Sequence, residues 1–365
     1  MQSSYFSFPS DAESHYYDII ERTSMFRNQP PHEYAGYGGP WVENHFIETF
    51  LEKPFLYFNG FIPLFIQWVD LMLNNKLPYV AEILRQILRP NVLYIAVSQS
   101  DTGLSYITER HPNILVISSG GYGHIPIPLI KDELPIVGVP EKFKFDISFC
   151  GNTKQWGREK ILNDIEAEAK RLSISSYIVR WSKTWYTELQ ETKFTLAPRG
   201  YGRRYFVFSV CSLFSSPTLS RKYLHSPNIC VLWGFSSFRF SEVIQTGRLP
   251  VYIYDDYEWL PYVSTPADIS EYSFSLKSDS NVTKFLHVIM NVSSRDYLRR
   301  IDKVRELRKL FTYKGVMEQI ALFLQDPLGP TGGYLRCTRL PDTEKGWRSR
   351  DGRTRRLLTA YETPP

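Results

Sequence analysis

The stretch Phe194-Thr-Leu-Ala-Pro-Arg-Gly-Tyr-Gly-Arg203 joins a short apolar run to a turn with glycines and arginines. The apolar run is typical of a buried strand. Gly200 and Gly202 let the backbone approach a ligand closely, and backbone N–H groups at such a turn bind anions. Arg199 and Arg203 can add charge-assisted hydrogen bonds to a diphosphate. The turn predicts a phosphate-binding site, although turns of this composition are more often plain loops.

Strands and helices alternate on both sides of this turn. Short apolar runs predict strands at 92–98, 114–118, 146–150, 178–180, 194–197 and 249–254. Helical spacing or capping predicts helices at 71–88, 158–172, 186–191, 238–245, 297–311 and 315–325. Such alternation indicates parallel sheets with helices on their faces. We expect an α/β protein with domains at 1–143 and 144–325, followed by a disordered tail at 326–365.

Composition restricts the class of protein. The chain has 365 residues, of which 43% are hydrophobic and 22% charged, as in ordinary globular proteins. The formal net charge is +5, and the basic residues are spread out except between Arg348 and Arg356. A nucleic-acid binder concentrates them on one surface, so we expect no nucleic-acid partner.

Metal and membrane signals are weak. None of the four cysteines forms a CxxC pair, so we expect no metal site, although Cys150 and Cys337 could pair in an oxidising compartment. Residues 1–14 lack the basic and apolar regions of a signal peptide. The apolar stretch Pro54–Val69 is shorter than a membrane span and contains Asn59 and Gln67. We therefore expect it to be buried in a globular core, with no membrane span in this chain.

The phosphate-binding turn differs from two common fingerprints. No Gly-Lys-Ser/Thr follows it, which excludes the Walker pattern, and the GxGxxG spacing is absent. The missing dinucleotide fingerprint disfavours an NAD-dependent enzyme.

Several motifs together resemble the donor site of exostosin-like glycosyltransferases. These motifs are Phe194–Arg203, the run Phe238-Arg-Phe-Ser-Glu-Val-Ile-Gln-Thr-Gly-Arg-Leu-Pro-Val-Tyr252, the pair Asp255-Asp256 and the segment Trp259-Leu-Pro-Tyr262, in the family's order. The strand at 145–151 with the basic helix start Arg158 also fits, and Ser118–His124 resembles the family's Ser-Gly-Gly-x-Asp-His element more faintly. The resemblance covers about residues 90–325.

The resemblance implies a GT-B architecture, in which two Rossmann-like domains face a cleft. It implies an inverting, metal-independent transfer of a hexose or pentose from a nucleotide-sugar, most often a UDP-sugar, to a glycan or glycoprotein in the Golgi. Arg199, Arg203 and Arg239 become candidates for the diphosphate, together with Gly200 and Gly202. Glu242 becomes the candidate for the ribose hydroxyls, the alternative being an exposed helix glutamate. The nucleotide-sugar is a substrate, and no cofactor is implied.

An inverting transfer needs a general base from the N-terminal domain. His124 is the first candidate because its ordinary pKa lies near neutral pH, and Asp101 and Asp70 follow. His124 could instead cap a turn, and Gly123 stands where the family tends to have an acid. The pair Asp255-Asp256 could bind Mg²⁺ or Mn²⁺, but we expect a loop that lines the cleft.

Residues 204–235 interrupt the turn between its two matching halves. A structureless insert of this length is uncommon inside a compact domain. The insert is either a genuine loop over the site or translated intron, and we favour intron because its removal restores the family pattern. Codons AGGTAT for Arg204-Tyr205 would resemble a splice site, and sequencing the transcript tests this hypothesis. If the insert is genuine, the chain could be a non-catalytic carbohydrate- or nucleotide-binding protein of the same fold.

Overall fold

The computed structural model describes residues 9–33, 36–100, 104–108, 110–111, 113–121, 123–153, 158–179, 182, 185–200, 236–255, 257–327 and 330–337. Three predicted site residues, Asp101, Gly202 and Arg203, lie outside these ranges, as do Asp256 and the whole insert 204–235.

The first sheet is parallel, with strand order β1-β2-β3-β4. Its strands are β1 (Ile62–Pro63), β2 (Tyr94–Ser98), β3 (Ile114–Ser118) and β4 (Ile125–Pro126). Every residue of β2 and β3 is buried, as expected for a parallel sheet covered on both faces. The strands predicted at 92–98 and 114–118 are thereby confirmed.

Helices surround the first sheet. They are α1 (Ala12–Arg22), η1 (Ser24–Phe26), α2 (Val42–Phe50), η2 (Phe55–Phe58), α3 (Trp68–Leu73), α4 (Leu77–Ile87) and α5 (Ser105–Thr108). The helix predicted at 71–88 corresponds mainly to α4, but the prediction missed the break that separates α3 from α4. Asn75 between them has a φ of 58°, a left-handed conformation that asparagine tolerates. Pro78 then occupies the first turn of α4, where its missing N–H costs nothing.

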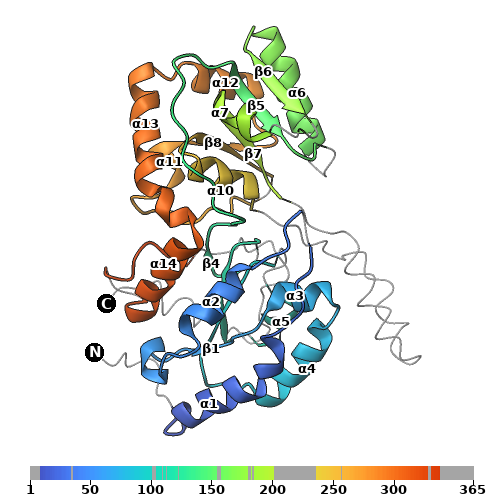
Figure 1. Cartoon of the computed structure of the whole chain (residues 1–365), viewed down its shortest axis with the longest axis vertical. Helices are drawn as coiled ribbons and strands as arrows, with labels where there is room; N and C mark the ends of the chain where they lie inside the picture. Colours follow the sequence, from blue (N-terminus) through green and yellow to red (C-terminus); the bar gives the residue numbers. More distant parts are fainter. Residues whose placement is uncertain are drawn as a thin grey trace, which may run out of the picture.

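The second sheet is also parallel, with strand order β6-β5-β7-β8-β9. Its strands are β5 (Phe145–Cys150), β6 (Ser176–Val179), β7 (Thr192–Pro198), β8 (Leu249–Tyr254) and β9 (Phe274–Lys277). The helices between consecutive strands are α6 (Arg158–Arg171), α7 (Trp185–Gln190), α10 (Phe238–Gln245) and α11 (Ile269–Tyr272). Two parallel sheets with helical crossovers, one above the other in Figure 1, make an α/β architecture of the GT-B type, as expected.

The last helices cover the second sheet and then return to the first half of the molecule through α14. They are α12 (Val282–Met290), α13 (Ser294–Leu307), η3 (Arg308–Phe311) and α14 (Tyr313–Gln325). Helix α14 leaves the second sheet and packs against α2 and η2, beside the first sheet (Figure 1). At this contact the ring of Tyr313 stacks on His45 with a centroid separation of 4.0 Å. The chain thus crosses twice between its two halves, once before β5 and once before α14.

Part of the stretch expected to be disordered packs against α14. The backbone N–H of Tyr334 donates to Gln319 Oε1 at 2.7 Å, and Leu335 is buried. The expected disorder therefore does not include residues 330–337.

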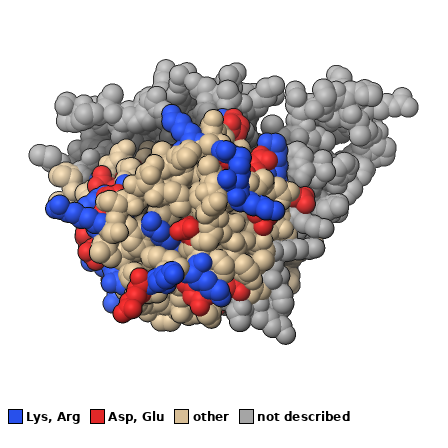
Figure 2. Space-filling model, turned by 90° about the horizontal axis from the view of Figure 1, so that it is seen from above, with Lys and Arg blue, Asp and Glu red and all other residues tan. Residues whose placement is uncertain are grey.

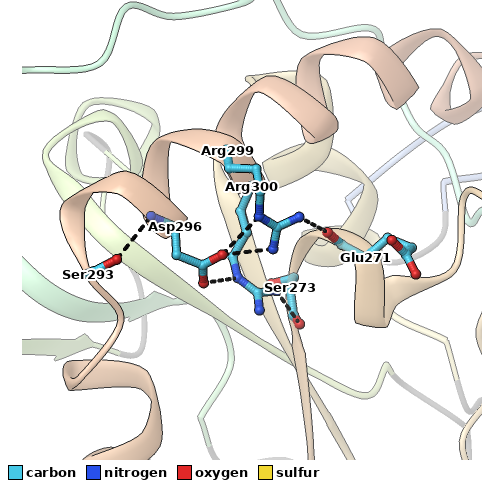
Figure 3. A network of polar contacts seen from close by, with 6 residues as sticks. All are labelled: Glu271, Ser273, Ser293, Asp296, Arg299 and Arg300. Atoms are coloured by element: carbon cyan, nitrogen blue, oxygen red, sulfur yellow. Dashed lines mark hydrogen bonds and ion pairs between the residues drawn. The ribbon is translucent and has the colours of Figure 1, made fainter.

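A network of arginines fixes the start of α13 (Figure 3). The carboxylate of Asp296 accepts hydrogen bonds from Arg299 and Arg300 at 2.8 Å, and Ser293 caps the helix. Arg300 also donates to the carbonyl of Ser273, which directly precedes β9. These arginines therefore lie at the amino edge of the second sheet.

Charges of both signs are interspersed on the face of the described chain that Figure 2 shows. Surface pairs such as Lys160–Asp164 and Arg171–Glu168 belong to α6. Exposed pairs of this kind contribute roughly 0–1 kcal/mol each.

No helix of the described chain is long and apolar enough to cross a membrane. The stretch 61–66, inside the segment expected to be core, is buried. Cys150 and Cys337 are free thiols, so the pairing considered for them is not present.

Candidate functional site

The carboxyl ends of β5, β7 and β8 lie side by side at one edge of the second sheet. Pro198 at the end of β7 pairs in register with Ile253 of β8, and β5 adjoins β7 on its other side. Ligands of open α/β sheets bind beyond the carboxyl ends of the strands. Arg199 directly follows β7 and Asp255 directly follows β8, while Arg158 comes from the start of α6, and the structure brings these three residues together.

Arg199 is buried between the ends of β7 and β8. Its backbone N–H donates to Ile253 at 2.9 Å, and its Nε lies 2.6 Å from a carboxylate oxygen of Asp255. The Asp255 carboxylate is therefore part of an ion pair. Among the described residues, no group of three or more His, Cys, Asp or Glu side chains could hold a metal ion.

Arg158 reaches into the same edge from the first position of α6. Its guanidinium donates to the carbonyls of Arg199, at 2.6 Å from Nε, and of Pro198 and Asn152. Burial lowers the pKa of Arg158 to about 10, and the positive charges of Arg199 and Arg239 act in the same direction. The sequence prediction had not included Arg158 among the diphosphate-binding residues. A cation at a helix N-terminus opposes the helix dipole, and this unfavourable position is the signal that could have found it.

Arg239 lies on the first turn of α10 and forms an ion pair with Glu242, one turn further along, with 3.1 Å between Nη1 and Oε2. Arg239 also donates to the carbonyl of Cys150 at the end of β5, at 2.9 Å, and stacks 4.3 Å from the ring centre of Trp185. Only 16% of the Arg239 side chain and 13% of the Glu242 side chain are exposed. Glu242 is thus no exposed helix glutamate, which was the alternative to its predicted role.

Gly200 closes the described part of the turn. Its N–H donates to the carbonyl of Ser236 at 2.5 Å. The residues on either side of the stretch 201–235 are therefore hydrogen-bonded to each other. A Cβ at Gly200 would lie 2.6 Å from the Ser236 oxygen, which no real side chain tolerates. Gly200 is therefore required by close backbone approach.

His124 lies at the edge of the first sheet and is buried. The N–H of Val116 donates to its Nδ1 at 3.0 Å, and its own N–H donates to the Val116 carbonyl at 2.8 Å. Burial lowers the pKa of His124 to about 3. An imidazole whose Nδ1 accepts a hydrogen bond carries its proton on Nε2, so it is not placed to take another. The geometry fits the turn-capping alternative and gives the predicted base role no support.

Buried carboxylates lie close to the end of β2. Asp70 accepts a hydrogen bond from Trp41 Nε1 at 3.0 Å, and burial raises its pKa. Glu43, which the sequence prediction had not included, accepts from the backbone N–H groups of Val69 at 2.7 Å and Gln99 at 3.0 Å. Burial raises the pKa of Glu43 to about 7. These carboxylates hold α2, α3 and the end of β2 together.

Comparisons with known proteins give matches in structure but not in sequence. No protein-family profile matches the chain, and no curated protein matches its sequence. Solved structures similar to it include TarM, at 10% identity over 68% of this chain and 53% of that one, with a TM-score of 0.38. They also include a glycosyltransferase from Rickettsia africae ESF-5, at 10% identity over 87% of this chain and 95% of that one, with a TM-score of 0.32. The matched part of the chain spans about half the length of TarM.

Proposed function

We propose that this protein is a glycosyltransferase that moves a sugar from a nucleotide-sugar to a glycan or glycoprotein acceptor. The observation that carries this proposal is the convergence of Arg158, Arg199 and Arg239 on the carboxyl ends of β5 and β7, with Glu242 one helical turn further along α10. Guanidinium groups bind the diphosphate, and Glu242 accepts hydrogen bonds from the ribose hydroxyls.

The arginines suit a leaving diphosphate because the fold holds them in place. Arg158 and Arg239 are anchored to main-chain carbonyls, so they need little rearrangement when negative charge develops. Preorganised donors of this kind stabilise charge in the transition state better than water does. Residues of this chain can therefore stabilise the leaving group, and the proposal needs no metal.

The reaction proposed is a direct displacement. The acceptor hydroxyl oxygen bonds to the anomeric carbon while the bond from that carbon to the diphosphate oxygen breaks, and the bond's electron pair leaves with the nucleoside diphosphate. The hydroxyl proton passes to a general base, and the anomeric centre is inverted. Asp101, one of the predicted bases, lies outside the described residues. The proposal does not depend on His124 as the base.

The finer details rest on the resemblance to exostosin-like glycosyltransferases. That resemblance supports UDP as the nucleotide, and the Golgi as the compartment that we propose. The proposed donor residues are Arg199, Arg203, Arg239, Glu242, Gly200 and Gly202, to which the geometry adds Arg158.

A second candidate is a non-catalytic protein of the same fold that binds a nucleotide or carbohydrate. It is favoured by the engaged Nδ1 of His124 and by the ion pair of Arg199 with Asp255. This candidate keeps ligand binding at the same edge but has no turnover.

A donor panel tests these proposals. The purified chain is incubated with UDP-, GDP- and CMP-sugars, with and without glycan acceptors, and release of the nucleotide is measured. We expect release from a UDP-sugar, its loss in Arg239→Gln, and its retention in Arg300→Gln. Arg300 is a matched control because it also pairs with a carboxylate on its own helix and lies over a ring, 4.6 Å from that of Phe274.

Binding of UDP without any release would support the non-catalytic candidate. Neither binding nor release with any nucleotide would contradict both.

A further inference from the structure

The segment that carries the chain from β4 to β5 is held by both halves of the molecule. Its Ile130 carbonyl accepts hydrogen bonds from Gln99 Nε2 and from the hydroxyl of Tyr313, both at 2.9 Å. Gln99 directly follows β2, and Tyr313 is the first residue of α14. Ile130 therefore belongs to the first half, and Lys131 is the next residue.

Beyond Lys131 the same segment is bound to the second half. Carbonyls of this segment accept hydrogen bonds from arginines around α13 and β8, namely Leu134 from Arg308, Val137 from Arg305 and Gly138 from Arg248. The N–H of Leu134 also donates to Gln245 Oε1 on α10, at 3.2 Å. Lys131 thus stands where the chain passes from one half to the other.

The ammonium group of Lys131 points to the start of α10. Its Nζ lies 4.5 Å from the ring centre of Phe238, the first residue of that helix. Burial lowers the pKa of Lys131, the carboxylate of Glu242 opposes that shift and Arg239 adds to it. Lys131 therefore interacts electrostatically with both Arg239 and Glu242 on α10, although it belongs to the segment between β4 and β5.

We propose that Lys131 is a further donor-binding residue, whose ammonium contacts the diphosphate together with Arg239. This inference rests on the proposed function and names a residue that the sequence motifs do not include. An ammonium on a flexible stem can follow a phosphate as a point charge, whereas the arginines bind in a fixed geometry. Two cations side by side attract an anionic group, so a diphosphate between Lys131 and Arg239 would receive charge-assisted hydrogen bonds from both.

The position of Lys131 gives the contact a second consequence. A diphosphate bound by Lys131 and Arg239 connects the crossing segment to α10, and Ile130 connects that segment to the first half. Donor binding would then stabilise the observed placement of the two halves. A purely structural Lys131 would act through contacts within the chain, such as its cation–π contact with Phe238.

Calorimetric titration with UDP and with uridine, which lacks phosphates, separates these roles. Lys131→Met keeps most of the apolar stem and removes the charge. We expect it to weaken UDP binding about tenfold, because a charge-assisted hydrogen bond is lost, and to leave uridine binding within about twofold. Lys131→Arg is expected to retain most UDP affinity. Lys303→Met, on α13 and paired with Glu306, is the matched control and is expected to change neither titration.

Phe238→Leu tests the structural role. If Lys131 acted only through the ring, Lys131→Met and Phe238→Leu would lower the melting temperature alike and leave the ratio of UDP to uridine affinity unchanged, which would overturn the inference. Unchanged UDP binding in Lys131→Met would also overturn it. A wild-type chain that binds no UDP would instead remove the proposed function on which the inference rests.

Discussion

Two edges of the molecule use polar side chains in the same way but differ in charge. The first edge lies around β2, β3 and the start of β4, and the second lies at the carboxyl ends of β5, β7 and β8. At the first edge, Glu43 and His124 accept hydrogen bonds from backbone N–H groups. Burial raises the pKa of Glu43 and lowers that of His124, and both shifts favour the neutral form. At the second edge, the guanidinium groups of Arg158 and Arg239 donate hydrogen bonds to backbone carbonyls. Burial cannot discharge an arginine at neutral pH, because its ordinary pKa lies too far above 7.

The difference in charge suggests different functions for the two edges. Both are rigid, because each polar group named above holds main chain in place. The second gathers the cations Arg158, Arg199, Arg239 and Lys131, with Asp255 and Glu242 paired to two of them. Asp132 and Glu188 lie near Lys131 and Cys150. We therefore expect an anionic ligand at the second edge rather than at the first.

The largest expected effect concerns His124 and acid stability. Burial lowers its pKa from 6.5 to about 3, so the folded state binds fewer protons than the unfolded state between these values. This contribution is present above pH 6.5 and is lost as the pH falls towards 3, by up to roughly 4 kcal/mol. His124→Asn can still accept from Val116 but does not titrate. Urea unfolding between pH 7 and 4 should therefore show a smaller loss of stability for the variant than for the wild type, and parallel curves would contradict a neutral, buried His124.

Glu43 is expected to show a smaller effect of opposite sign. Burial raises its pKa from 4.5 to about 7, so its contribution to stability is present below pH 4.5 and is lost as the pH rises through 7. The loss is on the order of 3 kcal/mol. Glu43→Gln does not titrate, so its stability relative to the wild type should rise between pH 5 and pH 8 by urea unfolding. A relative stability independent of pH would show that the Glu43 carboxylate is already charged at pH 5.

Gly200→Ala tests whether the close backbone approach of Gly200 and Ser236 is needed at the second edge. The added Cβ would lie 2.6 Å from the Ser236 carbonyl oxygen and force the two strands of the turn apart. We expect a loss of about 2 kcal/mol of unfolding free energy, with weaker UDP binding, because the backbone must move. Gly138→Ala is the control, since nothing lies within 4 Å of its Cβ position. Equal stability of both variants would show that the close approach of Gly200 to Ser236 is not maintained in solution.

The smallest expected effect is that of deleting residues 204–235. Gly200 donates to Ser236, so the deletion leaves Tyr201, Gly202 and Arg203 as a short loop between hydrogen-bonded residues. Loops of three residues commonly close such pairs. We expect a melting temperature within a few degrees of the wild type and UDP binding that is retained or stronger, measured by calorimetry. Loss of cooperative unfolding would show that the insert is required by the fold.

The sequence predicted correctly those helices and strands whose signals lie within a short stretch of the chain. The strand at 114–118 and the helix at 238–245 match β3 and α10, because β-branched runs and helical spacing are local signals. The break between α3 and α4 was missed, since the left-handed Asn75 is stabilised only in its context. The contacts of Glu43 were missed for a similar reason, because its partner Gln99 lies far along the chain.

The residues of the candidate site also fall into two groups, those that a sequence motif predicts and those that only the structure brings together. Arg199 and Arg239 were found through a local motif, and the structure brings both to the ends of β5, β7 and β8. Arg158 and Lys131 were not among the predicted donor residues, because only the folded chain brings Arg158 to the end of β7 and Lys131 to the start of α10. The sequence could show that His124 follows a glycine-rich segment, but it could not show that Val116 occupies its Nδ1.

Hydrogen exchange with and without saturating UDP tests the contrast between the two edges most directly. The account predicts protection in peptides that cover the ends of β5 and β7 and the start of α10, including Cys150, Gly200 and Arg239. It predicts no change around Gln99 and His124 at the first edge. Protection at the first edge alone, or none at either edge, would contradict the assignment of the anionic donor to the second sheet.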